Sequence, residues 1–150
     1  MAEVAFYQLK RPSIEQALFR LLEKALAGGK RAVVRLGSDE EMEALDNALW
    51  TLDPDSFLPH ATIKAKDPAG QPVLLTTGKD APNNARFAFL LPGGSREGLA
   101  AFERVFVIFD GAREAELNGA RTLWQDLKAS GATLAWWAQN DAGAWEKQDL

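Results

Sequence analysis

Two segments of the sequence hold residue types that nucleotide-binding proteins use. Gly28-Gly29-Lys30 resembles a phosphate-binding loop, and Asp110 follows the apolar run 105–109, as the magnesium-binding aspartate of nucleotide hydrolases does. The glycine-lysine segment, however, precedes a predicted strand instead of opening a helix, and residues 8–12, after the first predicted strand, contain no glycine. We therefore interpret the two glycines as a helix end and Asp110 as part of a turn at the end of a strand.

The remaining polar clusters offer little chemistry. Asp39, Glu40 and Glu41 follow Ser38 at a predicted helix start, where capping and the helix dipole account for acidic residues. His60 lies in a proline-rich loop, and the sequence has no second histidine and no cysteine. A hydrogen-bonded structural role is therefore favoured over catalysis for His60. The composition excludes thiolate nucleophiles and cysteine-based zinc sites, and we expect no cofactor and no metal.

Composition and charge narrow the class of protein further. The 150 residues, 47% apolar and 25% charged, are typical of one compact domain spanning 1–150. Seventeen basic against 21 acidic residues give a net charge of −4, which makes direct nucleic-acid binding the less favoured hypothesis. No 18-residue apolar run occurs, and Glu3 stands where a signal peptide would carry a basic residue. A cytoplasmic protein is expected.

The elements that must position any site alternate along the chain. Apolar residues with helical spacing predict helices over 14–26, 42–52 and 113–128, the first two begun by capping boxes at Ser13 and Ser38. Apolar runs predict strands over 4–9, 31–36, 105–109 and 133–138, of which 105–109 is apolar throughout and is expected at the centre. The pattern predicts an α/β fold: a three-layer, mostly parallel sheet with helices on both faces.

The intervening segments are less regular. Residues 53–72 contain four prolines and are interpreted as connecting chain. The apolar runs 73–76 and 87–91 are separated by a polar turn too brief for a crossover helix, so we expect them to pair antiparallel at an edge of the sheet. Residues 96–104 are expected to form a short helix, and the chain after residue 138 a polar tail containing Trp145.

Five tryptophans exceed what a core of this size requires, which indicates a recognition surface. Trp136 and Trp137, adjacent on one predicted strand, must face opposite sides of the sheet and are assigned to the core. On the predicted helix 113–128, Trp124 closes an apolar arc, and Arg121 and Lys128 lie at the edge of that arc. Trp124 is therefore expected at the boundary between buried and basic surface.

One combination of motifs resembles a known family. Residues 45–50 (LDNALW), followed by 56–60 (SFLPH), closely resemble the chi subunit of bacterial DNA polymerase III. Weaker agreements run in order along nearly the whole chain, at 6–9, 29–31, 72–73, 102–105 and 120–121. The resemblance implies a non-enzymatic accessory protein of the clamp loader, with a nucleotide-binding-like fold that lacks a phosphate loop. A degenerate helicase-like nucleotide-binding protein is the alternative reading.

The resemblance also implies partners and a site. A pocket of the family takes the acidic, phenylalanine-ending C-terminal tail of single-stranded-DNA-binding protein, and the psi subunit links chi to the clamp loader. Arg121 is expected to face the terminal carboxylate of the tail, while Lys128 and Arg113 attract its aspartates. The positions that match the family's pocket are Trp50, Phe57, Phe109, Arg121 and Trp124, and the four aromatic ones are expected to wall one cavity.

Overall fold

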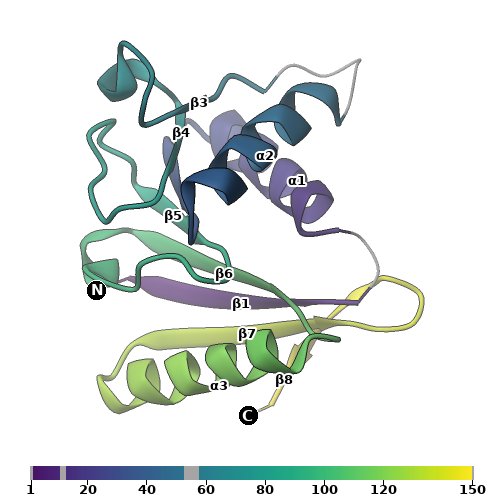
Figure 1. Ribbon diagram of the computed structural model, residues 1–150. Coiled ribbons are helices and arrows are strands. Elements are labelled where there is room, and N and C mark those ends of the chain that lie inside the picture. Colours follow the sequence, from purple (N-terminus) through teal and green to yellow (C-terminus); the bar gives the residue numbers. More distant parts are fainter. Residues whose placement is uncertain (1, 11–12, 53–57, 150) are drawn as a thin grey trace.

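The computed structural model describes residues 2–10, 13–52 and 58–149 (Figure 1). Strands and helices alternate along these residues. The strands are β1 (Glu3–Leu9), β2 (Ala32–Arg35), β3 (Ala61–Thr62), β4 (Val73–Thr76), β5 (Phe87–Leu90), β6 (Arg104–Asp110), β7 (Thr133–Gln139) and β8 (Trp145–Gln148). The helices are α1 (Ile14–Ala27), α2 (Asp39–Thr51) and α3 (Glu114–Ala129), with short 3-10 turns η1 (Pro68–Gly70) and η2 (Leu99–Ala101).

The strands form one sheet in the order β3-β4-β2-β5-β6-β1-β7-β8. Within the described residues every neighbouring pair is parallel except β7 with β8. As predicted, β6 lies in the interior of the sheet, and its residues 105–109 are all buried because side chains cover both of its faces. The predicted α/β class with a mostly parallel sheet is confirmed.

Local signals set the helix boundaries as expected. The Ser13 hydroxyl accepts the Gln16 N–H, and the Gln16 side chain accepts the Ser13 N–H, which completes a capping box at the start of α1. At the start of α2 the Ser38 hydroxyl accepts the Glu41 N–H, which is one of the two bonds of the predicted capping box. Gly131, with φ of 83°, follows α3 in the left-handed region that favours glycine.

The sheet divides the core into two parts. On one side of the sheet α1 and α2 bury apolar residues such as Leu18 and Leu45 against Val34, and on the other side α3 buries Leu123 against Val105 and its neighbours (Figure 1). Helix α2 contacts β3 and β4, whereas α3 contacts β6 and β7. The two outer layers are therefore offset: α2 lies toward one end of the sheet and α3 toward the other.

The predicted antiparallel pairing of 73–76 with 87–91 is wrong. β4 and β5 both pair with β2, one on each side, and both are parallel to it. These strands have four residues and are only about 13 Å long. The connection 77–86 can therefore return the chain across the sheet without a helix, since ten extended residues reach about 33 Å. The antiparallel prediction assumes that a parallel crossover needs a helix, which strands as short as these do not require.

The structure corrects three smaller expectations. Only the 3-10 turn Leu99–Ala101 forms in the segment 96–104, where a helix was expected. The expected polar tail contains β8, which pairs antiparallel with β7 and places Trp145 opposite Gln139. The connecting chain 53–72 contains, in its described part, the two-residue strand β3 and the turn η1.

Candidate functional site

An aromatic cluster lies beneath α3. The Trp136 ring stacks on Phe6 with centroids 5.1 Å apart and meets Phe109 edge-on at 5.3 Å. The Trp124 ring approaches Phe6 and Trp136 edge-on, at 5.3 and 5.6 Å. Offset and edge-on contacts are the arrangements that aromatic rings favour. The sheet and α3 thus hold Trp124 in a fixed orientation.

Only one member of this cluster reaches the surface. Phe6, Phe109 and Trp136 are buried, and the indole N–H of Trp136 donates to the Gln8 side-chain oxygen at 3.0 Å. Trp124 is half-buried. The prediction that Trp124 lies at the edge of the core is confirmed. Trp136 belongs to the core as expected, whereas Trp137, also assigned to the core, is only half-buried.

Two basic residues flank the exposed part of Trp124. Arg121 precedes it by three residues and Lys128 follows it by four, so all three side chains lie along one flank of α3. Both cations are exposed, and neither forms an ion pair with any residue that the structure describes. Arg121, Trp124 and Lys128 are hereafter called the α3 flank. An aromatic surface with two available cations suits a ligand that is both apolar and anionic.

Arg113, which is expected to attract the aspartates of the tail, lies beside two carboxylates of its own chain. Its guanidinium lies 3.6 Å from the carboxylates of both Asp110 and Glu116. The Asp110 carboxylate also accepts the N–H of Ala112 at 2.9 Å, while its backbone N–H donates to Glu116 at 3.0 Å. Arg113 is therefore engaged locally, and the interpretation of Asp110 as part of a strand-end turn is supported.

The structure does not bring Trp50 to the α3 flank, so the expectation of one cavity walled by Trp50, Phe109 and Trp124 is wrong. Trp50 lies on α2, which covers the other face of the sheet (Figure 1). Its indole is 47% exposed and its ring lies 4.2 Å from that of His60. A sequence motif shows that residues are near in the chain but not which face of a sheet each will reach. Phe57 lies outside the described residues.

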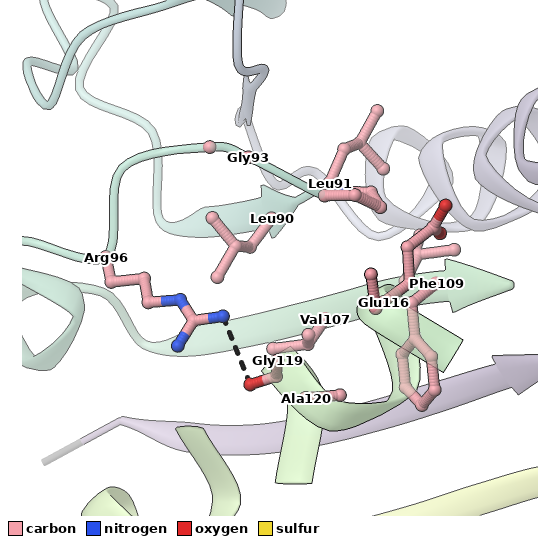
Figure 2. Close-up of a pocket in the computed structure, with 13 residues that line it drawn as sticks. Leu90, Leu91, Gly93, Arg96, Val107, Phe109, Glu116, Gly119 and Ala120 are labelled. Carbon is pink, nitrogen blue, oxygen red and sulfur yellow. Dashed lines mark hydrogen bonds between the residues drawn. The ribbon is translucent and has the colours of Figure 1, made fainter. Parts of the chain in front are cut away.

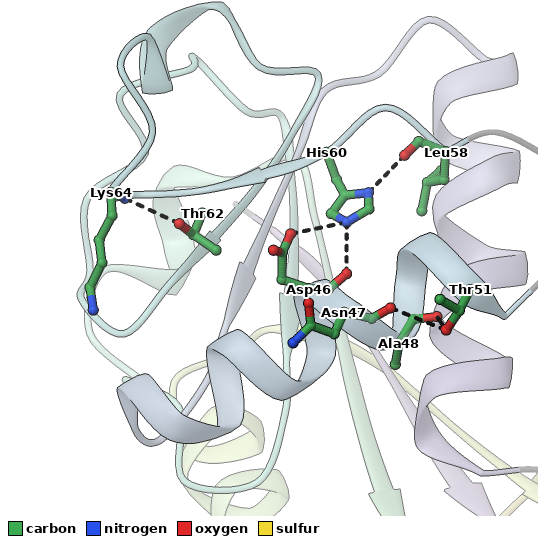
Figure 3. A network of polar contacts seen from close by, with 8 residues as sticks. All are labelled: Asp46, Asn47, Ala48, Thr51, Leu58, His60, Thr62 and Lys64. Carbon is green, nitrogen blue, oxygen red and sulfur yellow. Dashed lines mark hydrogen bonds and ion pairs between the residues drawn. The ribbon is translucent and has the colours of Figure 1, made fainter.

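His60 is held by hydrogen bonds, as its structural interpretation predicts (Figure 3). The ring is buried, with Nδ1 2.7 Å from the Leu58 carbonyl oxygen. Nε2 lies 3.1 Å from both the carbonyl oxygen and a carboxylate oxygen of Asp46. These contacts tie the segment that follows α2 back onto the helix.

A cavity of about 420 Å³ opens on the other flank of α3, at the carboxyl ends of β5 and β6 (Figure 2). Leu90, Val107 and Phe109 line it from the sheet, and the Arg96 guanidinium donates across it to the Gly119 carbonyl oxygen at 3.1 Å. The bordering turn requires glycine, because a Cβ at residue 94 would lie 2.6 Å from a backbone oxygen of β2. Sequence reasoning missed this cavity, although the carboxyl ends of parallel strands are where open α/β sheets bind ligands.

Other kinds of site are not seen in the described part of the chain. No helix there is long and apolar enough to cross a membrane. No group of three or more histidine, cysteine, aspartate or glutamate side chains is placed to hold a metal ion among these residues.

Together these elements define a Rossmann-like, three-layer α/β protein with a basic-aromatic flank on α3. A family model described as "DNA polymerase III chi subunit, HolC" matches residues 1–135, and the chain belongs to this family. A relative from Rickettsia prowazekii (strain Madrid E), named "Probable DNA polymerase III subunit chi", is 25% identical over 157 residues, which cover 98% of this chain and 92% of the relative. The resemblance found in the sequence is confirmed. The family is that of an accessory subunit of the replicative polymerase.

Proposed function

We propose that this chain is a non-catalytic subunit of the clamp-loader complex that connects the replicase to single-stranded-DNA-binding protein in the cytoplasm. The α3 flank binds the acidic C-terminal tail of that protein, and a psi subunit, where one exists, links the chain to the rest of the clamp loader. The observation that carries the proposal is the position of Arg121 and Lys128 beside Trp124 in a chain of the chi family.

The chemistry of the α3 flank matches that of the tail. The terminal phenylalanine ring packs against Trp124, which lies on the outer side of the cluster that contains the buried Phe109. Arg121 pairs with the terminal carboxylate, and Lys128 attracts the aspartates of the tail. Burial of a phenyl ring contributes about 1.5–3 kcal/mol, and charge-assisted hydrogen bonds from arginine about 1.5–3 kcal/mol more. After ordering costs, micromolar binding, about −8 kcal/mol, is attainable.

The resemblance assigns Trp50 and Phe57 to tail binding as well. Because α2 lies on the other side of the sheet from α3, Trp50 does not share a cavity with Trp124. We propose that any contribution of Trp50 is a second contact with the same partner, separate from the one at the α3 flank. Trp50→Ala is then expected to cost less affinity than Arg121→Ala.

The proposal is tested by titrating the protein with a peptide that copies the acidic, phenylalanine-ending tail and recording tryptophan fluorescence. We expect micromolar affinity that weakens with added salt, and a loss of about tenfold or more in Arg121→Ala. The matched control is Lys66→Ala, which removes an exposed lysine far along the chain from α3. This variant should bind the peptide as tightly as the unmodified protein does. Unchanged affinity in Arg121→Ala, or an equal loss in Trp50→Ala, would contradict the α3 flank as the principal tail site.

Asp110, at the end of β6, motivates the alternative of a degenerate helicase-like nucleotide-binding protein. Its carboxylate already accepts a backbone N–H and lies beside Arg113, which disfavours metal-nucleotide binding there. Isothermal titration with ATP and magnesium is expected to show no stoichiometric binding. A saturable heat at one equivalent would favour the nucleotide-binding alternative over the adaptor.

A further inference from the structure

A groove runs along α1 on the face of the sheet opposite to α3. It consists of two adjoining hollows of about 700 and 380 Å³ that share Leu21 and Lys24 of α1. Tyr7 and Phe106 lie in the hollow nearer β6, and Trp145 of β8 lines the other. The ring of Tyr7 contacts those of both other aromatics, at 6.1 Å from Phe106 and 5.2 Å from Trp145. The aromatic rings are therefore continuous from one hollow to the other.

This groove occupies a gap in the helical layer. Parallel strands normally have helices over both faces. On the α1 side, however, the described helices make their main contacts with β2, β3, β4 and β6, while α3 contacts β7 from the other side. Because residues alternate along a strand, the half-buried Trp137 faces the α1 side, opposite to the buried Trp136. The gap lies beside α1, where one more helix of the layer would pack at about 8–10 Å between axes.

The groove differs in charge from the rest of the protein. Its lining residues include four basic side chains and one acidic side chain, Glu23, whereas the whole chain carries a net charge of −4. Lys30 and Arg104 are partly neutralised by Glu103 and Glu3, at 3.1 and 3.8 Å. Arg20 and Lys24, one helical turn apart on α1, are exposed and form no ion pair with any described residue. The wall along α1 is therefore complementary to an anionic partner.

We propose that this groove binds an amphipathic helix of a partner protein, with the apolar stripe of that helix on Tyr7 and Trp145 and acidic residues along its flank facing Arg20 and Lys24. The stretch of α1 from Gln16 to Ala27 is about 17 Å long, enough for three turns of a neighbouring helix. The wall formed by Gln139, Gly143 and Trp145 lies beyond residue 135, the last that the family model matches. The groove is separate from the α3 flank, so a second partner can bind it while the α3 flank is occupied.

The test uses the full chain with Ala27, an exposed residue that lines the groove, replaced by cysteine (Ala27→Cys). The sequence contains no other cysteine, so an environment-sensitive dye attaches there alone. The probe is a synthetic helical peptide with a leucine stripe flanked by glutamates, compared with the same peptide carrying lysines in their place. We expect a saturable dye response to the acidic peptide and affinity weaker by about tenfold or more for the basic one.

Reversing the charge of the groove's two cations on α1 tests whether the peptide binds there. Arg20→Glu combined with Lys24→Glu is expected to lower the affinity for the acidic peptide by about tenfold. Replacing both residues with alanine is expected to lower it by a smaller factor. Lys66→Glu with Arg86→Glu reverses two exposed cations outside the groove, changes the net charge equally, and should keep affinity within about twofold. Arg121→Ala should leave this binding unchanged, which separates the groove from the α3 flank.

Four results would overturn the proposal. One is the absence of saturable binding, and another is an equal loss of affinity in the groove reversal and its control. A third is tighter binding of a single-stranded oligonucleotide than of the acidic peptide, which would make nucleic acid the occupant. The fourth is a dimer in sedimentation experiments that the groove reversal dissociates, which would make a second copy of this chain the occupant.

Discussion

Replacing Arg35 with methionine is expected to lower the free energy of unfolding by about 3–5 kcal/mol, a large part of the stability of a small domain. Arg35 ends β2 and is only 1% exposed. Its guanidinium donates to three backbone carbonyl oxygens: those of Ser95 at 3.0 Å, Glu97 at 2.6 Å and Lys79 at 2.7 Å. It also lies over the Phe102 ring, 5.3 Å from its centre. One side chain thus connects two loops.

These two loops cover a part of the sheet where a parallel sheet usually has a helix. The segments 77–86 and 91–103 cover the face of β2 from which Val33 and Arg35 project, whereas α3 makes its main contacts with β6 and β7. Burial lowers the pKa of the Arg35 guanidinium, while Glu97 and Asp80 act to raise it. An arginine nonetheless keeps its charge in a folded protein, so all three hydrogen bonds are charge-assisted. Methionine fills part of the volume but leaves three carbonyl groups without their donor.

Urea denaturation followed by circular dichroism measures the loss. The control is Arg96→Met, which removes an exposed arginine of the same loop that donates one hydrogen bond, and it should cost less than about 1.5 kcal/mol. Hydrogen exchange should show faster exchange in both loops of Arg35→Met. A variant as stable as the control would show that Arg35 does not hold the loops.

Replacing Trp136 with alanine is the other change with a large expected effect, about 3–5 kcal/mol of unfolding free energy. Its ring, 3% exposed, contacts the three other members of the aromatic cluster. Its removal leaves a cavity beneath α3 and takes away one of the two rings that orient Trp124. We therefore expect Trp136→Ala to weaken tail binding as well, although Trp136 itself is buried away from the tail.

Trp136→Phe separates the two effects. It keeps an aromatic ring but loses the hydrogen bond to Gln8, and should cost about 1–2 kcal/mol with tail affinity little changed. Denaturation and the peptide titration are both measured below the unfolding transition of the weaker variant. A cost below about 1 kcal/mol for Trp136→Ala would show that the cluster can collapse around the missing ring.

The candidate site was only partly predictable from sequence. Helical spacing alone placed Arg121, Trp124 and Lys128 on one flank, because neighbours on a helix follow from the chain itself. The assignment of Trp50 to the same cavity was wrong because α2 and α3 pack on opposite faces of the sheet. The groove along α1 was missed altogether, since Tyr7 and Trp145 meet only after β8 folds back on β7.

The amino-acid sequence by itself determined where the three helices begin and end, and that the run 105–109 is buried on both faces. Caps such as Ser13 and apolar periodicity act within a few residues, so their effect is readable along the chain. Only the tertiary structure decided that β2 separates β4 from β5 and that α2 and α3 cover opposite faces. Which strands pair, and which face of the sheet each helix covers, depend on contacts between residues far apart in the chain. The energies of such contacts cannot be read from a local sequence pattern.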